Sequence, residues 1–85
     1  MNWQVKIANS AEKNLKKFPK KDRKRIVKVL SELGFNPYNG NIEKMEGEKS
    51  SWRRRVGNYR IFYDIYKGTK IISVTNIERR TSSTY

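Results

Sequence analysis

The residues of this chain best suited to chemistry are arginines. Residues 52–60 read WRRRVGNYR, which places four arginines within nine positions. A guanidinium is planar, stays protonated and can form two parallel hydrogen bonds, a geometry that fits phosphate oxygens. Because it practically never loses its proton, it binds and neutralises anions more readily than it acts as a base. The stretch therefore points to a phosphate-bearing partner.

The glycine and asparagine inside this stretch are the signal of a short β-hairpin. Residues that flank a two-residue turn pair directly, so Val56 should lie opposite Tyr59, and Arg55 opposite Arg60. Arg53, two residues before Arg55, should share its face of the sheet. Two opposed guanidiniums repel each other unless an anion lies between them, so we interpret the three arginines as a phosphate clamp. The alternative is a solvated pair of basic strands.

The composition of the whole chain agrees with an anionic partner. Its 85 residues carry 20 Lys and Arg against 8 Asp and Glu, a formal net charge of +12, and nucleic acid is the usual partner of such a surface. With no cysteine and no histidine, the chain lacks a thiolate nucleophile, so we expect no metal and no cofactor. The sequence shows neither a membrane-spanning run nor a signal peptide, so we expect it in the cytoplasm and away from membranes.

The spacing of apolar residues predicts the elements that would hold these arginines. In chain order they are a strand at 3–7, helices at 9–18 and 20–33, and strands at 51–56, 59–67 and 70–77. Pro19 separates the helices and should make them a hairpin. Ser10 suits the N-cap of the first helix, and Gly34 suits the position after the second. Residues 35–50 lack periodicity and read as a long loop.

This order predicts an α+β fold of the form β-α-α-β-β-β, in which the helix hairpin packs on one face of a twisted, mainly antiparallel sheet. We expect residues 1–85 to form one domain. If Ile61 and Ile65 point toward the helices, alternation along the strand places Arg60 and Phe62 on the open face.

A second basic stretch, KKFPKKDRKRIVK, covers the junction of the two helices. Such cations can bind the phosphates of ribosomal RNA without reading its sequence, in a salt-dependent way; the alternative is a solvated helix face. Tyr38 in the loop and Tyr66 on the side of Arg60 are candidates for stacking on bases. The candidate RNA-binding residues are Lys13, Lys16, Lys17, Lys20, Lys21, Arg23, Lys24, Arg54 and Arg80.

Several motifs together resemble the RelE/ParE superfamily of bacterial and archaeal toxin–antitoxin toxins. They are a helix hairpin ending in NP, a KMEG junction, the strands WRRRVGNYRIFYDI, and IERR before a last tyrosine. The resemblance spans nearly the whole chain and implies a microbial ribonuclease-like fold. For the RelE branch it implies an endoribonuclease that cuts mRNA in the ribosomal A site, inhibits translation, and is neutralised by an acidic, RelB-like antitoxin.

The resemblance also implies which residues form the site. Two basic residues of the family fall on Arg53 and Arg55, and the arginine after its turn falls on Arg60. The RelE branch often has lysine at the first two positions, and lysine can lose a proton when its pKa is lowered. Arg55 is therefore a poor general base, and the clamp is expected to neutralise charge on the scissile phosphate.

Near the C-terminus, the family's basic residue falls on Arg79, with Arg80 as the register alternative, and its tyrosine falls on Tyr85. RNA supplies its own nucleophile, the 2′-hydroxyl, so the protein must align it and assist the leaving 5′-oxygen. Arg79 would act at the leaving oxygen, and Tyr85 would orient or stack on a nucleotide. The candidate general bases are Glu78, ranked first because it adjoins Arg79, then Glu43, Glu46 and Glu48.

Other functions stay open at this point. In the ParE branch the same scaffold inhibits DNA gyrase without nuclease activity, and its strands carry a similar arginine pattern. The ending ERRTSSTY, with arginine and a last tyrosine, favours the RelE branch. A noncatalytic RNA-binding module would explain the charge but not the tyrosine. In either toxin branch we expect an acidic antitoxin segment to cover the open sheet face or the groove of the helix hairpin.

Overall fold

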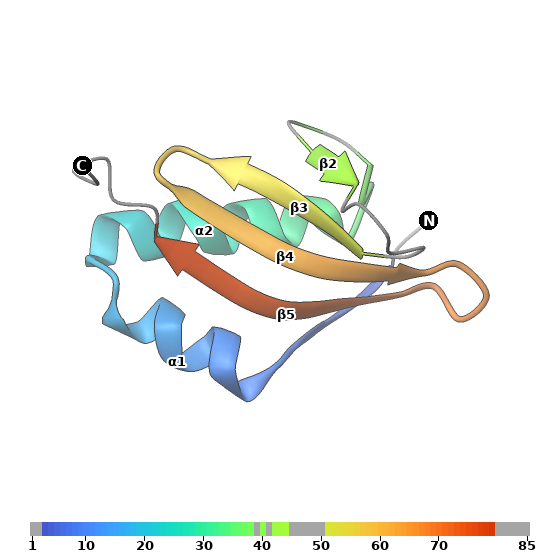
Figure 1. Ribbon diagram of the computed structural model, residues 1–85, viewed down its shortest axis with the longest axis horizontal. Coiled ribbons are helices and arrows are strands. Elements are labelled where there is room, and N and C mark those ends of the chain that lie inside the picture. The colour runs from blue at the N-terminus through green and yellow to red at the C-terminus, as the bar shows by residue number, and fades with distance from the viewer. Residues whose placement is uncertain (1–2, 39, 41, 45–50, 80–85) are drawn as a thin grey trace.

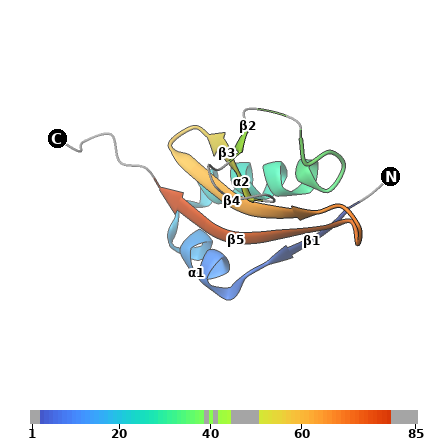
Figure 2. The ribbon, with the colours of Figure 1, turned by 45° about the vertical axis from the view of Figure 1, so that its right-hand side comes forward.

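The computed structural model describes residues 3–38, 40, 42–44 and 51–79. Within these ranges the chain forms helices that cover one face of a sheet and leave the other face open (Figures 1 and 2). The elements are β1 Gln4–Ile7, α1 Asn9–Lys17, α2 Lys20–Leu33, β2 Ile42–Lys44, β3 Ser51–Val56, β4 Tyr59–Tyr66 and β5 Ile71–Arg79. No helix in the described part of the chain is long and apolar enough to cross a membrane.

The sheet has five strands in the order β1-β5-β4-β3-β2. β1 runs parallel to β5, and the remaining neighbours are antiparallel. The predicted α+β class and mainly antiparallel sheet are therefore confirmed. The register between β4 and β5 shifts after Phe62, where Thr75 is the extra residue of a β-bulge. Bulges of this kind increase the local twist of a sheet.

The helices bury the apolar stripes that the sequence predicts. Ala11 of α1 and Ile26 and Leu33 of α2 are fully buried against the sheet. Val27 of α2, although apolar, is 52% exposed. Because it follows Ile26 by about 100° around the helix, Val27 turns away from the sheet and toward the space beside α1.

Both predicted helix caps are wrong. The N-cap of α1 is Ala8, and the hydroxyl of Ser10 instead donates to the backbone oxygen of Thr75 at 3.3 Å. Gly34 ends α2 with φ of −65°, which is right-handed, whereas the predicted cap requires a left-handed residue. The carbonyl oxygen of Gly34 accepts a hydrogen bond from the amide of Trp3 at 2.6 Å. This bond ties the end of α2 to the start of β1.

The predicted loop 35–50 contains a strand that sequence periodicity does not reveal. Ile42–Lys44 forms β2 and pairs with β3, with Glu43 directly opposite Arg53. A three-residue strand is too short to show alternation, and it forms here because the edge of β3 offers unpaired backbone groups. The sheet therefore has one strand more than the predicted β-α-α-β-β-β order.

The two hairpin turns differ, although each contains one glycine. Between β3 and β4 the turn has two residues as predicted, and Gly57 adopts φ of +58° at its first position, as in a type II′ turn. Between β4 and β5 the predicted two-residue turn is wrong, because Tyr66 pairs with Ile71 across four residues. There the left-handed residue is Lys70, with φ of +56°, and not Gly68.

We expect Gly57→Ala to destabilise the protein and Gly68→Ala to leave its stability nearly unchanged. An L-residue forced into the left-handed region costs roughly 1–2 kcal/mol. A Cβ at Gly57 would also lie 3.0 Å from Nη1 of Arg25, whereas a Cβ at Gly68 would meet nothing within 4 Å. Urea unfolding of both variants measures the difference, and equal free energies of unfolding would contradict this assignment of the turns.

Candidate nucleic-acid interface

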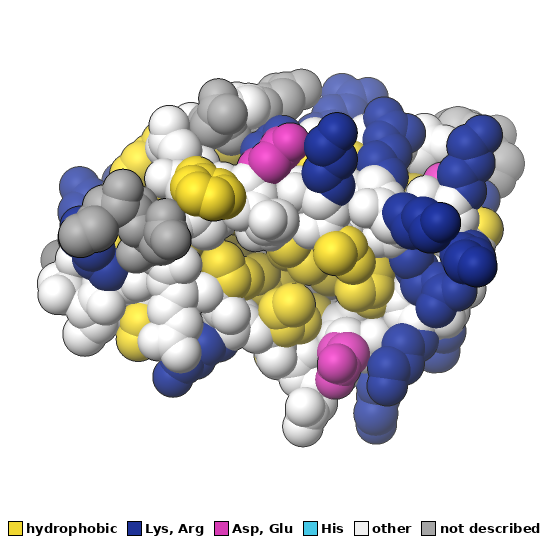
Figure 3. All heavy atoms as spheres, turned by 180° about the vertical axis from the view of Figure 1, so that it is seen from behind, with side chains coloured by type: hydrophobic (Ala, Val, Ile, Leu, Met, Phe, Trp, Pro, Cys, Tyr) yellow, Lys and Arg dark blue, Asp and Glu magenta, His cyan; other side chains and the backbone are white. Residues whose placement is uncertain are grey.

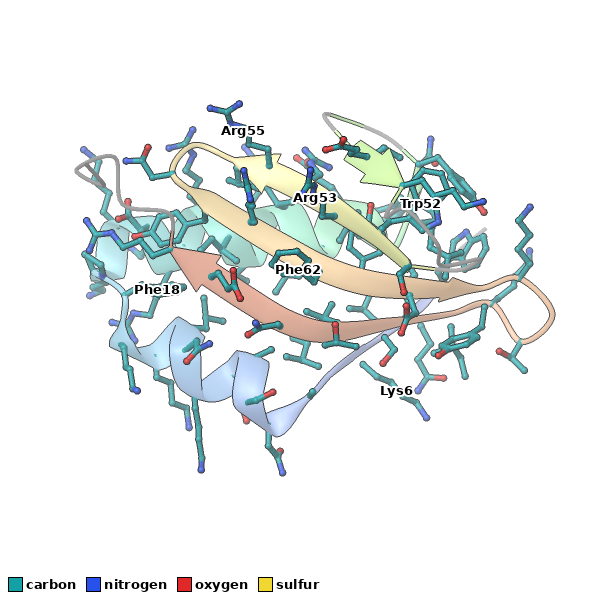
Figure 4. All side chains as sticks on the ribbon, viewed as in Figure 1. Lys6, Phe18, Trp52, Arg53, Arg55 and Phe62 are labelled. Atoms are coloured by element: carbon teal, nitrogen blue, oxygen red, sulfur yellow. The ribbon has the colours of Figure 1, made fainter. Side chains whose placement is uncertain are left out.

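The register of β3 and β4 turns three arginines to the open face. Val56 pairs with Tyr59 and Arg55 with Arg60, as predicted. Val56 and Tyr59 are buried on the helix side. Because neighbouring side chains alternate, Arg55 and Arg60 project from the opposite side, and Arg53 shares their face. Figure 4 shows Arg53 and Arg55 leaving β3 on the same side.

These arginines line a cavity of about 130 Å³ together with Glu43 of β2. This volume is well above the roughly 10–15 Å³ that one water needs, so a hydrated anion can enter. Glu43 Oε1 accepts hydrogen bonds from Arg53 at 2.9 Å from Nε and 2.5 Å from Nη2. We call Arg53, Arg55 and Arg60 the clamp. From sequence, Glu78 ranked first because it adjoins Arg79, and Glu43 was placed in a loop because β2 was not predicted.

Glu78 lies on the same face as the clamp and is held there through α1. It stands opposite Arg60 in the register of β4 and β5. Its Oε2 accepts a hydrogen bond from Asn76 Nδ2 at 2.9 Å, and Asn76 Oδ1 accepts one from Asn14 Nδ2 at 3.1 Å. These hydrogen bonds hold the carboxylate of Glu78 on the β5 side of the clamp, and the carboxylate of Glu43 lies on the β2 side. Two further candidate bases, Glu46 and Glu48, lie outside the described residues.

Tyr59 anchors the turn end of the hairpin to α2 and to the residue that follows α1. Its hydroxyl donates to Asp22 Oδ2 at 2.6 Å, and its ring centroid lies 4.6 Å from that of Phe18. Burial, followed by the hydrogen bond to Asp22, raises the pKa of Tyr59, against a smaller opposing effect of Arg79. The phenol therefore stays neutral and keeps its bond at physiological pH.

Arg79 lies on the helix side, away from the clamp. It pairs with Tyr59, and its guanidinium sits 5.9 Å from the centroid of the Tyr59 ring. Within the described residues, Arg79 therefore does not share the face of the clamp. Arg80, the register alternative, and Tyr85 lie outside the described residues.

Arg54 also points to the helix side, although Arg53 and Arg55, its neighbours in sequence, belong to the clamp. Its side chain is 13% exposed, and its Nη2 lies 3.6 Å from Glu32 Oε1. A Cβ on Gly40 would clash with the guanidinium, so Gly40 leaves the room that this side chain occupies. Burial raises the pKa of nearby Tyr63 to about 12, although the charge of Arg54 lowers it. Arg54 thus belongs to the packing beneath β3, and the open face does not include it.

The basic residues of the helices surround a groove on the opposite side of the molecule. Figure 3 shows apolar side chains gathered in a hollow on this side, with basic side chains crowded at one end. The groove has a volume of about 470 Å³. The buried Nε of Arg23 has no hydrogen-bond partner among the described residues. The lining residues are Glu12, Leu15, Lys16, Lys20, Arg23, Lys24 and Val27, and the exposed Lys13, Lys17 and Lys21 lie on the same helices.

The two tyrosines expected to stack on bases differ in their surroundings. Tyr38 is packed edge-on against Trp3, at 6.5 Å between ring centroids, and against Trp52, at 5.7 Å. Tyr66 is 46% exposed on the open face, where its hydroxyl lies 3.5 Å from Asp64 Oδ2. Tyr38, although 39% exposed, is held by these ring contacts, and Tyr66 has the freer ring.

Comparisons by sequence and by structure all match the chain to toxins of toxin–antitoxin systems. Residues 5–83 match the family described as the ParE toxin of the type II toxin–antitoxin system, parDE. The chain is 28% identical over 83 residues to the RelE1 protein of Methanocaldococcus jannaschii, covering 94% of this chain and 92% of that protein.

Solved structures agree with the sequence match. The RelE–RelB complex of Pyrococcus horikoshii contains a chain that superposes with a TM-score of 0.84 at 26% identity, covering 98% of this chain and 100% of the other. The isolated RelE toxin of E. coli shares the fold, with a TM-score of 0.81 at 19% identity over 96% of this chain and 88% of that one. The chain belongs to the RelE/ParE superfamily and is a toxin of a type II toxin–antitoxin system.

Proposed function

We propose that this toxin is a ribosome-dependent endoribonuclease that cleaves mRNA in the A site and so inhibits translation in the cytoplasm. The observation that carries the proposal is the cavity on the open face, lined by Arg53, Arg55 and Arg60 together with Glu43. Three guanidiniums lining one cavity, with that of Arg53 held by Glu43, suit the nonbridging oxygens of a phosphodiester. The similarity to RelE proteins supports the same reading.

In this mechanism the 2′-hydroxyl of the RNA attacks the adjacent phosphorus and forms a 2′,3′-cyclic phosphate. The bond from phosphorus to the 5′-oxygen of the next nucleotide breaks, and that oxygen takes up a proton from water. The clamp neutralises the negative charge that builds up on the phosphate in the transition state. A carboxylate at the edge of the clamp, Glu43 or Glu78, accepts the proton of the 2′-hydroxyl. Because Glu43 lines the cavity itself, we favour it as the general base over Glu78, which ranked first from sequence.

The remaining assigned residues complete the site in this proposal. Because Arg79 is turned toward Tyr59, its register alternative Arg80 becomes the stronger candidate for the leaving oxygen. Tyr85 orients a nucleotide of the mRNA. The lysines at the junction of α1 and α2 bind ribosomal RNA through its phosphates, and this contact should weaken as salt rises.

The partner that silences the toxin is proposed to be an acidic, RelB-like antitoxin that docks in the groove between α1 and α2. The groove has an apolar floor containing Leu15 and Val27 and a cationic rim. An amphipathic segment with acidic residues along one side would match both, and it would supply an acceptor to the Nε of Arg23, which has none in the described part of the chain. The P. horikoshii relative was crystallised as a RelE–RelB complex, which supports this partner class.

Inhibition of DNA gyrase is the second candidate function. The matched family is described as ParE toxin, and the arginine strand by itself does not separate the two branches. The two candidates differ in their need for the clamp, because only phosphodiester cleavage requires three guanidiniums converging on one phosphate.

We expect Arg60→Ala to abolish most mRNA cleavage while the protein stays folded. Loss of one group that stabilises transition-state charge typically costs about 10²–10³-fold in rate. Removal of one of two opposed guanidiniums also relieves repulsion, so the free energy of unfolding should change by no more than about 1 kcal/mol. Cleavage of mRNA on programmed ribosomes and urea unfolding measure the two effects.

Lys6→Ala is the control for Arg60→Ala. Lys6 is exposed on the same face but two strands away, on β1, so its loss removes the same charge outside the clamp. Arg55→Lys should retain cleavage or increase it if proton transfer at this position matters. Unfolding of the Arg60→Ala protein would show that Arg60 is structural and contradict the assignment of faces.

We further expect deletion of Tyr85 to remove most cleavage, with Tyr85→Phe losing less. The deletion removes an aromatic ring able to stack on an unpaired base, whereas phenylalanine keeps the ring and loses only the hydroxyl. Thr84→Ala provides the control for general effects of changing this segment. Growth arrest and mRNA cleavage measure the outcome, and a fully active deletion variant would make gyrase the target to test.

A further inference from the structure

Phe62 stands at the centre of the open face and is surrounded by polar side chains. It pairs with Arg53 of β3 and Asn76 of β5. Figure 4 shows its ring on the side of the sheet from which Arg53 projects. By the same register and alternation, its same-face neighbours are Arg53, Asn76, Arg60, Asp64, Ser51, Arg55, Ser73 and Glu78.

No ring contact of Phe62 is present within the described part of the chain, in contrast to several other aromatic residues. Phe18 and Tyr59 pack together, and Tyr38 packs against two tryptophans. Phe62 is partly exposed and contributes nothing to the buried core on the helix side. A single exposed apolar residue is common on proteins, but this one lies one row of the sheet below the pair Arg55 and Arg60.

We propose that Phe62 is the platform on which a base of single-stranded RNA stacks while the clamp holds the neighbouring phosphate. Residues two apart on a strand are separated by about 7 Å, so the ring lies one step along β4 from Arg60. The flat hydrophobic ring supplies a stacking surface, and the surrounding arginines attract the backbone. The inference rests on the proposed function, because it takes the clamp to bind RNA.

Asn76 and Asp64, two polar neighbours of Phe62, form hydrogen bonds within the protein, so we expect Phe62 to discriminate little between bases. Both ends of the Asn76 amide are engaged, with Asn14 and the amide of Ile77 on its oxygen and Glu78 on its nitrogen. Asp64 Oδ1 accepts a hydrogen bond from the hydroxyl of Ser51 at 2.5 Å. Stacking tolerates all four bases because every base has a π-face, so the platform should hold a nucleotide with little base preference.

The test uses the full chain with a short 2′-O-methyl RNA that contains 2-aminopurine, whose fluorescence falls when the base stacks. The missing 2′-hydroxyl prevents cleavage, so binding is measured apart from catalysis. At low salt we expect the wild-type protein to quench the probe. Phe62→Tyr should quench it equally, and Phe62→Val, which keeps strand propensity but lacks a ring, should lose the quenching and roughly tenfold in affinity.

Phe35→Val is the matched control, because it makes the same truncation at a phenylalanine that is 68% exposed just after α2 and does not lie on β4. It should leave quenching unchanged, and circular dichroism should show that every variant is folded. The inference is overturned if wild-type protein does not quench the probe at low salt, if Phe62→Val quenches like wild type, or if Phe35→Val alone abolishes quenching. Quenching without mRNA cleavage would instead keep the platform and refute the nuclease.

Discussion

The position of the clamp depends on the burial of Val56 and Tyr59 on the helix side of the β3–β4 hairpin. These two residues pair across a two-residue turn and pack over α1 and α2, with Tyr59 bonded to Asp22. A shift of the register by one residue would expose both and turn the arginines inward. The apolar contacts beneath the sheet therefore hold Arg55 and Arg60 face to face, at a cost in repulsion that a bound phosphate would remove.

Strong periodic signals in the sequence predicted the elements that build this arrangement. The helix stripes, the β3–β4 turn and the outward face of Arg53, Arg55 and Arg60 follow from alternation and turn chemistry alone. Features that depend on a tertiary partner did not. β2 forms only beside the edge of β3, so Glu43 was placed in a loop.

The other differences between the predicted and the observed structure depend on how β5 and its turn pair with β4. The bulge at Thr75 and the helix-side position of Arg79 depend on how β5 pairs with β4, which sequence periodicity does not determine. The left-handed conformation falls on Lys70, although the turn also contains Gly68. Phe62 lay on the predicted open face, yet nothing in its type or spacing separates a stacking ring from an ordinary strand residue.

The two sides of the molecule carry different chemistry. The open face offers guanidiniums, carboxylates and the aromatic rings of Phe62 and Tyr66, which suits a flexible phosphate-bearing strand. The helix side offers an apolar groove with a cationic rim, which suits an acidic protein segment. In our proposal the mRNA and the antitoxin therefore occupy different surfaces of one small, highly charged toxin.

The most direct test of the nuclease proposal is a map of RNA 5′ ends after brief induction of the toxin, with and without an inhibitor of translation. We expect new ends inside translated codons, and we expect them to disappear when translation is blocked. Intact mRNA, accompanied by double-strand breaks and an SOS response, would contradict the proposal and identify gyrase as the target.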